Sequence, residues 1–182
     1  HIIPGLSAFV GGDITAGILA SGMLEQEAST LLIDLGTNGE MALGNRHRLH
    51  ACATAAGPAF EGGANRGIWG ADMVRLLQKL LEEGLMDGQG LLKEPYFTKG
   101  VRIGDVLVTK ESVRAVQLAK GAIAAGIEIL ADSYGIRFSD ISKVVLAGGF
   151  GYYLDPKAAV AIGLLPEELA DCTVTGGNTA LS

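Results

Sequence analysis

The chain has 182 residues, of which 48% are apolar and 19% are charged, and this balance is sufficient for a folded globular core. The net charge is −6 and the sequence has no cluster of Lys or Arg, which argues against a nucleic-acid-binding protein. No charge-free apolar stretch is long enough to cross a bilayer, so the sequence predicts no membrane association.

The two cysteines bear on the redox compartment of the chain, and the first residue bears on whether the chain is part of a longer protein. Cys52 and Cys172 are too few for a disulfide framework or a metal cluster, and they predict a reducing, cytoplasmic compartment. The chain begins with His1 in place of Met. We therefore expect it to be part of a longer protein.

The first predicted helix covers residues 14–20 and follows an apolar segment at residues 2–10. Asp13 stands directly before this helix, where its carboxylate is expected to act as the N-cap. At a helix start that faces a cleft, the same carboxylate could instead orient a water molecule. Asp13 is therefore also a candidate catalytic residue.

A strand, a tight turn and a returning strand are predicted over residues 31–44. The first strand ends at Asp34, and the turn combines small residues with hydrogen-bond donors that suit phosphate oxygens: Gly36, Thr37, Asn38 and Gly39. Asp34 could hold Mg²⁺ through water or orient an attacking water. An ordinary solvated turn capped by Asp34 is the alternative. Glu40 is expected to be either solvated or bonded to a neighbouring loop.

A third strand, over residues 48–54, is expected to complete an antiparallel meander. It leads into the loop Gly57–Gly63, which is rich in turn residues and should bring the backbone close to a ligand or to another subdomain. Glu61 lies in this loop, and the sequence leaves its role open between a partner contact, a hinge hydrogen bond and plain surface.

An amphipathic helix is predicted over residues 69–83, with Gly84 as its stop. Residues 84–104 are irregular, with several Gly and Pro, and predict an excursion from the core. A short apolar segment follows at residues 105–109.

A second, longer helix is predicted over residues 111–134 and ends at Gly135. Apolar residues line one of its faces, and small residues permit close packing against a sheet. Gln117 and Lys120 are expected on a solvated face of this helix, with contact to a nucleotide as the alternative.

A buried strand is predicted over residues 143–147, and it stops at Gly148, Gly149 and Phe150. Asp155 and Pro156 then provide an N-cap and a first helical residue for a short helix, and one more strand follows at residues 172–175. This order of elements predicts an α/β fold with a mixed sheet and helices on both faces.

Two of these segments together resemble a known superfamily. The hairpin at 34–40 and the Leu-Ala-Gly-Gly-Phe-Gly stretch at 146–151 resemble the second phosphate motif and the adenosine motif of actin, sugar kinases and seventy-kilodalton heat-shock chaperones. In that ribonuclease H-like fold, two βββαβαβα subdomains close over ATP. Segments 33–40 and 53–62 are similar to the ATP-dependent reductive activators of corrinoid proteins, whose C-terminal region carries the ATPase fold.

The resemblance implies that residues 1–182 are the second half of an actin-like ATPase domain, with 1–28 as a connecting helix region and 29–182 as one subdomain. The first phosphate hairpin and the cysteines for a two-iron two-sulfur cluster would lie outside the chain, so the isolated chain is expected to be inactive. The parent protein would couple ATP hydrolysis to an electron transfer that restores cob(I)amide. A corrinoid protein is the implied partner, and a homodimer is left open.

The resemblance also implies site residues, with ATP and Mg²⁺ as cofactors. Asp34 would act on water or on Mg²⁺ through water, and Asp13 would be a second catalytic carboxylate. The residues implied in nucleotide binding are Gly36, Thr37, Asn38, Gly39, Glu40, Gly148, Gly149 and Phe150. Two alternatives stay open: a non-catalytic actin-like assembly module, and half of a small-molecule kinase.

Overall fold

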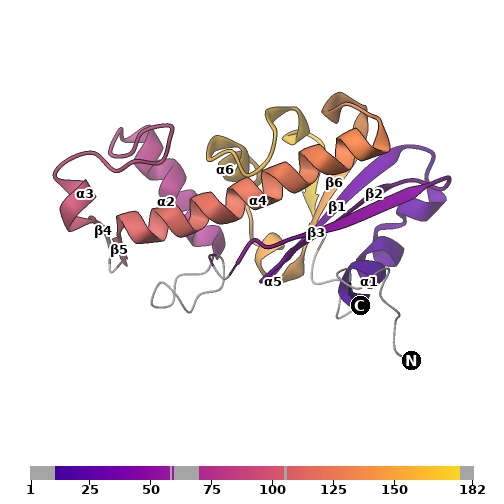
Figure 1. The fold of residues 1–182 in the computed structure, drawn as a ribbon, viewed down its shortest axis with the longest axis horizontal. Helices are drawn as coiled ribbons and strands as arrows, with labels where there is room; N and C mark the ends of the chain where they lie inside the picture. The colour runs from indigo at the N-terminus through magenta and orange to yellow at the C-terminus, as the bar shows by residue number, and fades with distance from the viewer. Residues whose placement is uncertain (1–10, 58, 60–69, 105, 177–182) are drawn as a thin grey trace.

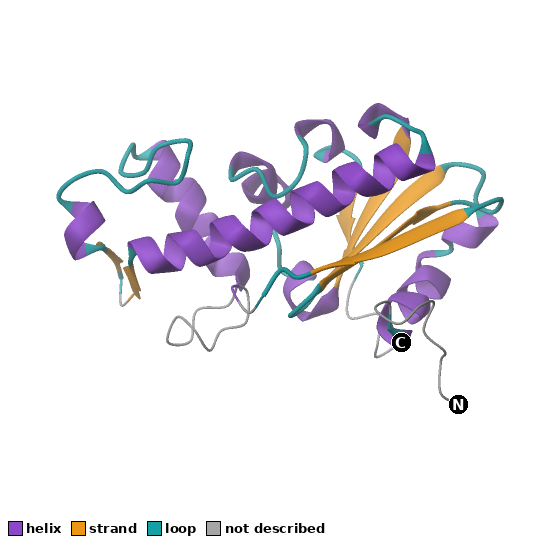
Figure 2. Cartoon of the chain, in the orientation of Figure 1, coloured by secondary structure: helices purple, strands orange, loops and turns teal. Residues whose placement is uncertain are grey.

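A five-stranded mixed sheet forms the body of the molecule, and helices cover both of its faces (Figures 1 and 2). The predicted α/β class is therefore confirmed. In this computed structural model the described residues are 11–57, 59, 70–104 and 106–176. The segment 2–10, Glu61 and most of the loop around it lie outside this range.

The sheet has the strand order β3-β2-β1-β6-β7. Strands β1 (Ser29–Leu35), β2 (Gly39–Gly44) and β3 (Leu49–Thr54) form the predicted antiparallel meander. Strands β6 (Ile141–Ala147) and β7 (Thr173–Thr175) lie parallel to β1. Since β1 and β6 run in the same direction, their carboxyl ends meet at one edge of the sheet.

Alternating side chains of β1 contact helices on opposite faces of the sheet. Leu31 and Ile33 belong to the large core that includes the apolar residues of α4 (Lys110–Tyr134), whereas Leu32 packs in a smaller cluster with α1 (Gly12–Ser21). Side chains of a strand alternate with a period of two, so Asp34 points to the same face as Leu32. The carboxylate therefore lies on the α1 side of the sheet.

Helix α4 follows the sequence prediction closely. Thr109 caps its start by accepting a hydrogen bond from the Ser112 amide, and Gly135 ends it with φ of 78°. Gly126 permits the close approach of the sheet, because a β-carbon there would lie 2.6 Å from Cγ2 of Thr54. The 25-residue helix packs on β2 and β3 and continues beyond the sheet (Figure 1).

The excursion lies around the far end of α4, away from the sheet (Figure 1). Helix α2 (Gly70–Glu82) precedes the excursion, whose own elements are α3 (Tyr96–Lys99) and β4 (Val101–Ile103), and β4 pairs with β5 (Val106–Val108) just beyond it. Helix α2 matches its predicted range to within one residue. The sequence analysis missed α3 and β4, which are only four and three residues long and carry no periodic pattern.

Two expectations near the sheet edge need correction. Asp13 is not the N-cap of α1; that position is Gly11, and Asp13 lies in the first turn. The segment Gly148–Gly151 is a single helical turn, α5, where a plain turn was expected. By contrast, Asp155 caps α6 (Pro156–Ala161) as predicted, its Oδ1 accepting from the Lys157 amide at 3.0 Å.

The described residues also contain the short 3-10 helices η1 (Met23–Glu25), η3 (Phe138–Asp140) and η4 (Glu167–Leu169). Within the described part of the chain, no helix combines the length and the apolar character needed to cross a membrane.

Candidate functional site

The structure brings together two glycine corners that are far apart in the sequence. Asp34 of β1 is paired with Ala147 of β6, so the turn after β1 and the corner at Gly148 lie next to each other. A β-carbon on Gly148 would lie 2.4 Å from Oδ1 of Asp34 and 2.7 Å from the Leu35 carbonyl oxygen. The two corners therefore lie side by side at the carboxyl end of the sheet, which is where open α/β sheets commonly bind ligands.

Three carboxylates gather on the α1 side of this edge. Asp34 and Glu40 are cross-strand partners in β1 and β2, and Asp13 lies in the first turn of α1. The pKa of Asp34 is raised to about 6, first by burial and then by the negative charges of Asp13 and Glu40. A carboxyl group in this range changes protonation near neutral pH and is suited to proton transfer.

Glu40 connects the sheet to the start of α1. Its Oε1 accepts a hydrogen bond from the Gly11 amide at 3.2 Å, so of the two expectations for Glu40 the bonded one is correct. The amides of a helix start lack partners within the helix and favour negative charge. Glu40 therefore ties the N-cap residue Gly11 to the sheet, while the described residues provide no side-chain cap for α1.

The turn between β1 and β2 is exposed at Gly36, Thr37 and Asn38 and buried at Gly39. The Gly36 amide donates to the Asn38 carbonyl at 3.1 Å, which closes the turn. A β-carbon on Gly39 would lie 2.7 Å from Oγ1 of Thr54, so Gly39 is required for packing. The three residues before it are accessible to a ligand.

At the corner after β6, Gly149 has free space around it and Gly148 does not. A β-carbon on Gly149 would meet no heavy atom of the described residues within 4 Å, whereas Gly148 adopts φ of 84° and is tightly packed. The side chain of Phe150 is 8% exposed and belongs to the core. Only the main chain of Phe150 is therefore available at this corner.

A cavity of about 350 Å³ lies near the end of α5, and the described residues that line it are Ala71, Asp72 and Arg75 of α2 and Tyr153. Its size falls within the range of small-molecule sites, and it offers both an aromatic ring and a guanidinium group. The sequence analysis missed Arg75 and Tyr153, because no motif connects residues on α2 with the segment after α5.

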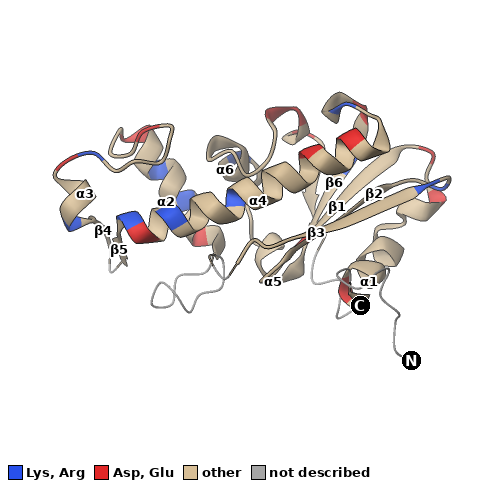
Figure 3. Ribbon diagram, in the orientation of Figure 1, with Lys and Arg blue, Asp and Glu red and all other residues tan. Residues whose placement is uncertain are grey.

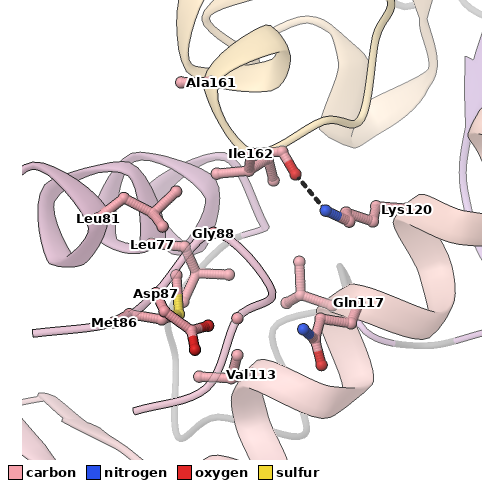
Figure 4. Close-up of a pocket in the computed structure, with 12 residues that line it drawn as sticks. Leu77, Leu81, Met86, Asp87, Gly88, Val113, Gln117, Lys120, Ala161 and Ile162 are labelled. Atoms are coloured by element: carbon pink, nitrogen blue, oxygen red, sulfur yellow. Dashed lines mark hydrogen bonds between the residues drawn. The ribbon is translucent and has the colours of Figure 1, made fainter. Parts of the chain in front are cut away.

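Gln117 and Lys120 do not lie on a solvated face. They line a cavity of about 300 Å³ between α2, α4 and the end of α6 (Figure 4). The Lys120 ammonium donates to the Ile162 carbonyl at 2.6 Å, and the Gln117 amide donates to the Gln89 carbonyl. Both side chains therefore hold separate segments against α4.

Among the described residues, no group of three or more His, Cys, Asp or Glu side chains is placed to hold a metal ion directly. The thiols of Cys52 and Cys172 are free, and burial raises the pKa of each. Neither environment favours the thiolate that a nucleophile or a metal ligand requires.

Comparison with known proteins gives consistent matches. The chain is 35% identical to the corrinoid activation enzyme RamQ of Eubacterium limosum over 91% of this chain and 37% of that protein. It is 26% identical to a [Co(II) methylated amine-specific corrinoid protein] reductase of Methanosarcina barkeri over 98% of this chain and 42% of that protein. The chain thus spans about two fifths of the length of these curated relatives.

A solved structure titled reductive activator for corrinoid, iron-sulfur protein superimposes with a TM-score of 0.88 and 31% identity, covering 100% of this chain and 37% of that one. Residues 28–66 and 63–182 match the family described as the C-terminal domain of RACo, the ASKHA domain. The chain belongs to this family of C-terminal ASKHA domains.

Proposed function

We propose that this chain forms the second half of an ATP-binding module in a reductive activator of a corrinoid protein. The observation that carries the proposal is that the exposed turn at residues 36–38 lies next to the open corner at Gly149, beside the half-buried carboxyl group of Asp34. The names of the relatives, a corrinoid activation enzyme and a reductive activator, support the same function for the longer protein.

The residues present fit a nucleotide. The accessible turn offers the amides of Thr37 and Asn38 and their side chains to phosphate oxygens, and Gly149 leaves room for ribose or adenine against the main chain. The cavity beside Arg75 and Tyr153 is a further candidate position for the purine. Neutral backbone donors suit a phosphate in a chain whose net charge is −6.

Asp34 is the proposed catalytic residue. Mg²⁺ retains most of its hydration shell in proteins, so one carboxylate can hold the ion through water, and the bound ion would neutralise phosphate charge. With a pKa of about 6, Asp34 can accept a proton from water or orient a water molecule. Asp13 and Glu40 keep that pKa raised, and Glu40 also fixes α1 beside the site.

The remaining parts of the activator belong to the longer protein in this proposal. The first phosphate hairpin of the superfamily would complete the ATP site, and a two-iron two-sulfur cluster would carry the electron to the corrinoid partner. Two free cysteines fit a reducing, cytoplasmic compartment. Closure of the two halves around ATP would couple hydrolysis to a rearrangement of the partner complex.

The test uses the protein at its natural length, with Mg-ATP, and follows phosphate release with and without a corrinoid protein in the inactive cob(II)amide state. We expect release that Asp34→Asn and Gly149→Val abolish, while the surface control Asp140→Asn leaves it unchanged. Phosphate transfer that depends on a sugar would instead identify a kinase. Filament formation with unchanged release in Asp34→Asn would identify an assembly module.

A further inference from the structure

The cavity of about 300 Å³ that contains Lys120 lies where the excursion meets three helices. It is bounded by α2, by the loop at residues 86–90, by the first half of α4 and by the end of α6 (Figure 4). Its lining includes no residue of the two glycine corners or of the cavity near α5. The proposed nucleotide site therefore leaves this cavity without a role.

Most of the cavity wall is apolar. Small-molecule sites commonly combine such a wall with a few polar groups, and this volume is at the lower end of their range, so the occupant has to be small. Five of the six large apolar side chains in the wall are buried, and Leu81 is half-buried. The six are Leu77, Leu81, Met86, Val113, Val116 and Ile162.

Lys120 brings a positive charge into this apolar wall from α4. An ammonium group has three hydrogen-bond donors, and the Ile162 carbonyl accepts one of them at 2.6 Å. The ion pairs formed among the described residues do not include Lys120. A carboxylate on a bound molecule would supply the missing opposite charge in a charge-assisted hydrogen bond.

Asp87 brings a negative charge into the same cavity from the loop after α2 (Figure 4). Its Oδ1 accepts hydrogen bonds from the amides of Gln89 and Leu91 at 3.0 and 2.8 Å. Its Oδ2 has no hydrogen-bond partner within the described part of the chain. An ammonium group on a bound molecule would therefore find an available acceptor.

Charges of both signs surround this end of the molecule. Lys and Arg are interspersed with Asp and Glu on α2, in the excursion and at the start of α4 (Figure 3). Long-range attraction therefore favours neither an anion nor a cation at the cavity. A molecule that carries one charge of each sign and no net charge suits these surroundings.

We propose that this cavity binds a small zwitterion with an apolar side chain, that is, an apolar amino acid. The carboxylate of the ligand pairs with Lys120, its ammonium group pairs with Asp87, and its side chain lies against the apolar wall. A ligand without the ammonium group would leave the negative charge of Asp87 facing its carboxylate, and a ligand without the carboxylate would meet the charge of Lys120. The two protein charges thus select for the zwitterion.

The occupant would contact several segments at the same time. Because it binds only the folded arrangement of α2, the excursion, α4 and α6, it should stabilise that arrangement in proportion to its occupancy. A ligand with so few atoms makes a limited contact, and a dissociation constant on the order of 0.1 mM is expected.

The experiment measures binding of L-leucine to the natural-length protein by isothermal titration calorimetry, without nucleotide. Isocaproate lacks the ammonium group and isopentylamine lacks the carboxylate, and each should bind at least tenfold more weakly. Asp87→Asn keeps an acceptor for the loop amides and Lys120→Gln keeps a donor for the Ile162 carbonyl, and each should weaken L-leucine binding at least tenfold. The exposed residues Lys143 and Asp132 supply the matched controls Lys143→Gln and Asp132→Asn, which should bind as the wild type does.

Hydrogen exchange locates the bound ligand, and circular dichroism checks that each variant folds. Exchange should slow at residues 86–92 and around Ile162 and stay unchanged in β1, β2 and β3. The proposal is overturned if L-leucine, L-methionine and L-phenylalanine all fail to bind saturably, or if the single-charge analogues bind as well as L-leucine. Protection confined to other segments, or full binding by both charge variants, overturns it as well. Since no nucleotide is present, these results do not depend on whether the proposed ATP site is correct.

Discussion

Gly148 lies so close to Asp34 that a β-carbon on the glycine would be 2.4 Å from the carboxylate oxygen Oδ1. This contact joins two segments that are separated by more than one hundred residues in the sequence. It also removes water from one side of the carboxyl group, and burial is the largest cause of the raised pKa of Asp34. The glycine is therefore part of what determines the chemistry of the acid.

The two neighbouring glycines should respond differently to the same substitution. Gly148→Ala combines a steric clash with Asp34 and a φ of 84°, so we expect a loss of about 2–4 kcal/mol in the free energy of unfolding. The β-carbon added in Gly149→Ala enters open space, so this variant should change the free energy of unfolding by less than about 1 kcal/mol. Urea denaturation measures both. Equal losses in the two variants would contradict the close contact at Gly148.

Asp34→Asn should stabilise the protein at neutral pH. The folded-state pKa of about 6 exceeds the ordinary value of 3.8, so the folded state holds a proton that the unfolded state releases. The contribution of Asp34 to stability is therefore highest below pH 4 and falls as pH rises through 6. Each unit of pKa shift corresponds to about 1.36 kcal/mol. The free energy of unfolding of Asp34→Asn should therefore exceed that of the wild type by up to about 3 kcal/mol at pH 7 and by almost nothing at pH 4.

Asp140→Asn is the control, because its effect on the free energy of unfolding should depend on pH in the opposite direction. Hydrogen bonds from Arg137 lower the pKa of Asp140, so its contribution is present at neutral pH and is lost as pH falls. Denaturation curves at several pH values should show the two variants diverging in opposite directions. If the stabilities of both variants, relative to the wild type, changed with pH in the same direction, the raised pKa of Asp34 would be contradicted.

Removal of either neighbouring charge should lower the pKa of Asp34. Asp13 contributes more than Glu40, so Asp13→Asn should produce the larger fall. Glu40→Gln keeps an acceptor for the Gly11 amide and should leave α1 in place. Titration of the Asp34 carboxyl carbon by NMR measures both shifts. An unchanged pKa in Asp13→Asn would place Asp13 outside the site.

Lys120→Met should lower the free energy of unfolding by about 1–2 kcal/mol, because the Ile162 carbonyl loses its charged donor. The exposed residue Lys143 supplies the control Lys143→Met, for which a change of less than about 0.5 kcal/mol is expected. Thermal or urea denaturation at neutral pH distinguishes the two. Equal effects would show that the Lys120 contact is not needed to hold α6.

Features set by short-range patterns could be predicted from the sequence. Helix α4 has an apolar face and a terminal Gly135, which the sequence indicated, and its range was predicted to within one residue at its start. Asp155 and Pro156 are likewise a local signal, and they cap α6 as expected. The proximity of the two glycine corners agrees with the resemblance, in which both motifs contact one nucleotide, and it arises from parallel pairing of β1 and β6.

Features set by distant partners were not visible in the sequence. Asp13 resembles an N-cap, but Glu40 on β2 bonds the helix start in its place. Lys120 looks solvated in a helical projection, yet the end of α6 folds over it. Arg75 and Tyr153 line one cavity only because α2 and α5 are neighbours in space. Local pattern cannot predict which segments will meet in this way.

The excursion shares its apolar interior with the sheet. Leu92 and Val101 belong to the same core cluster as Ile123 of α4 and Ile33 of β1. Deletion of the excursion to obtain a minimal domain would therefore leave apolar side chains of α4 bare and prone to aggregation. Any shortened version intended for expression should retain both ends of that helix and everything packed around them.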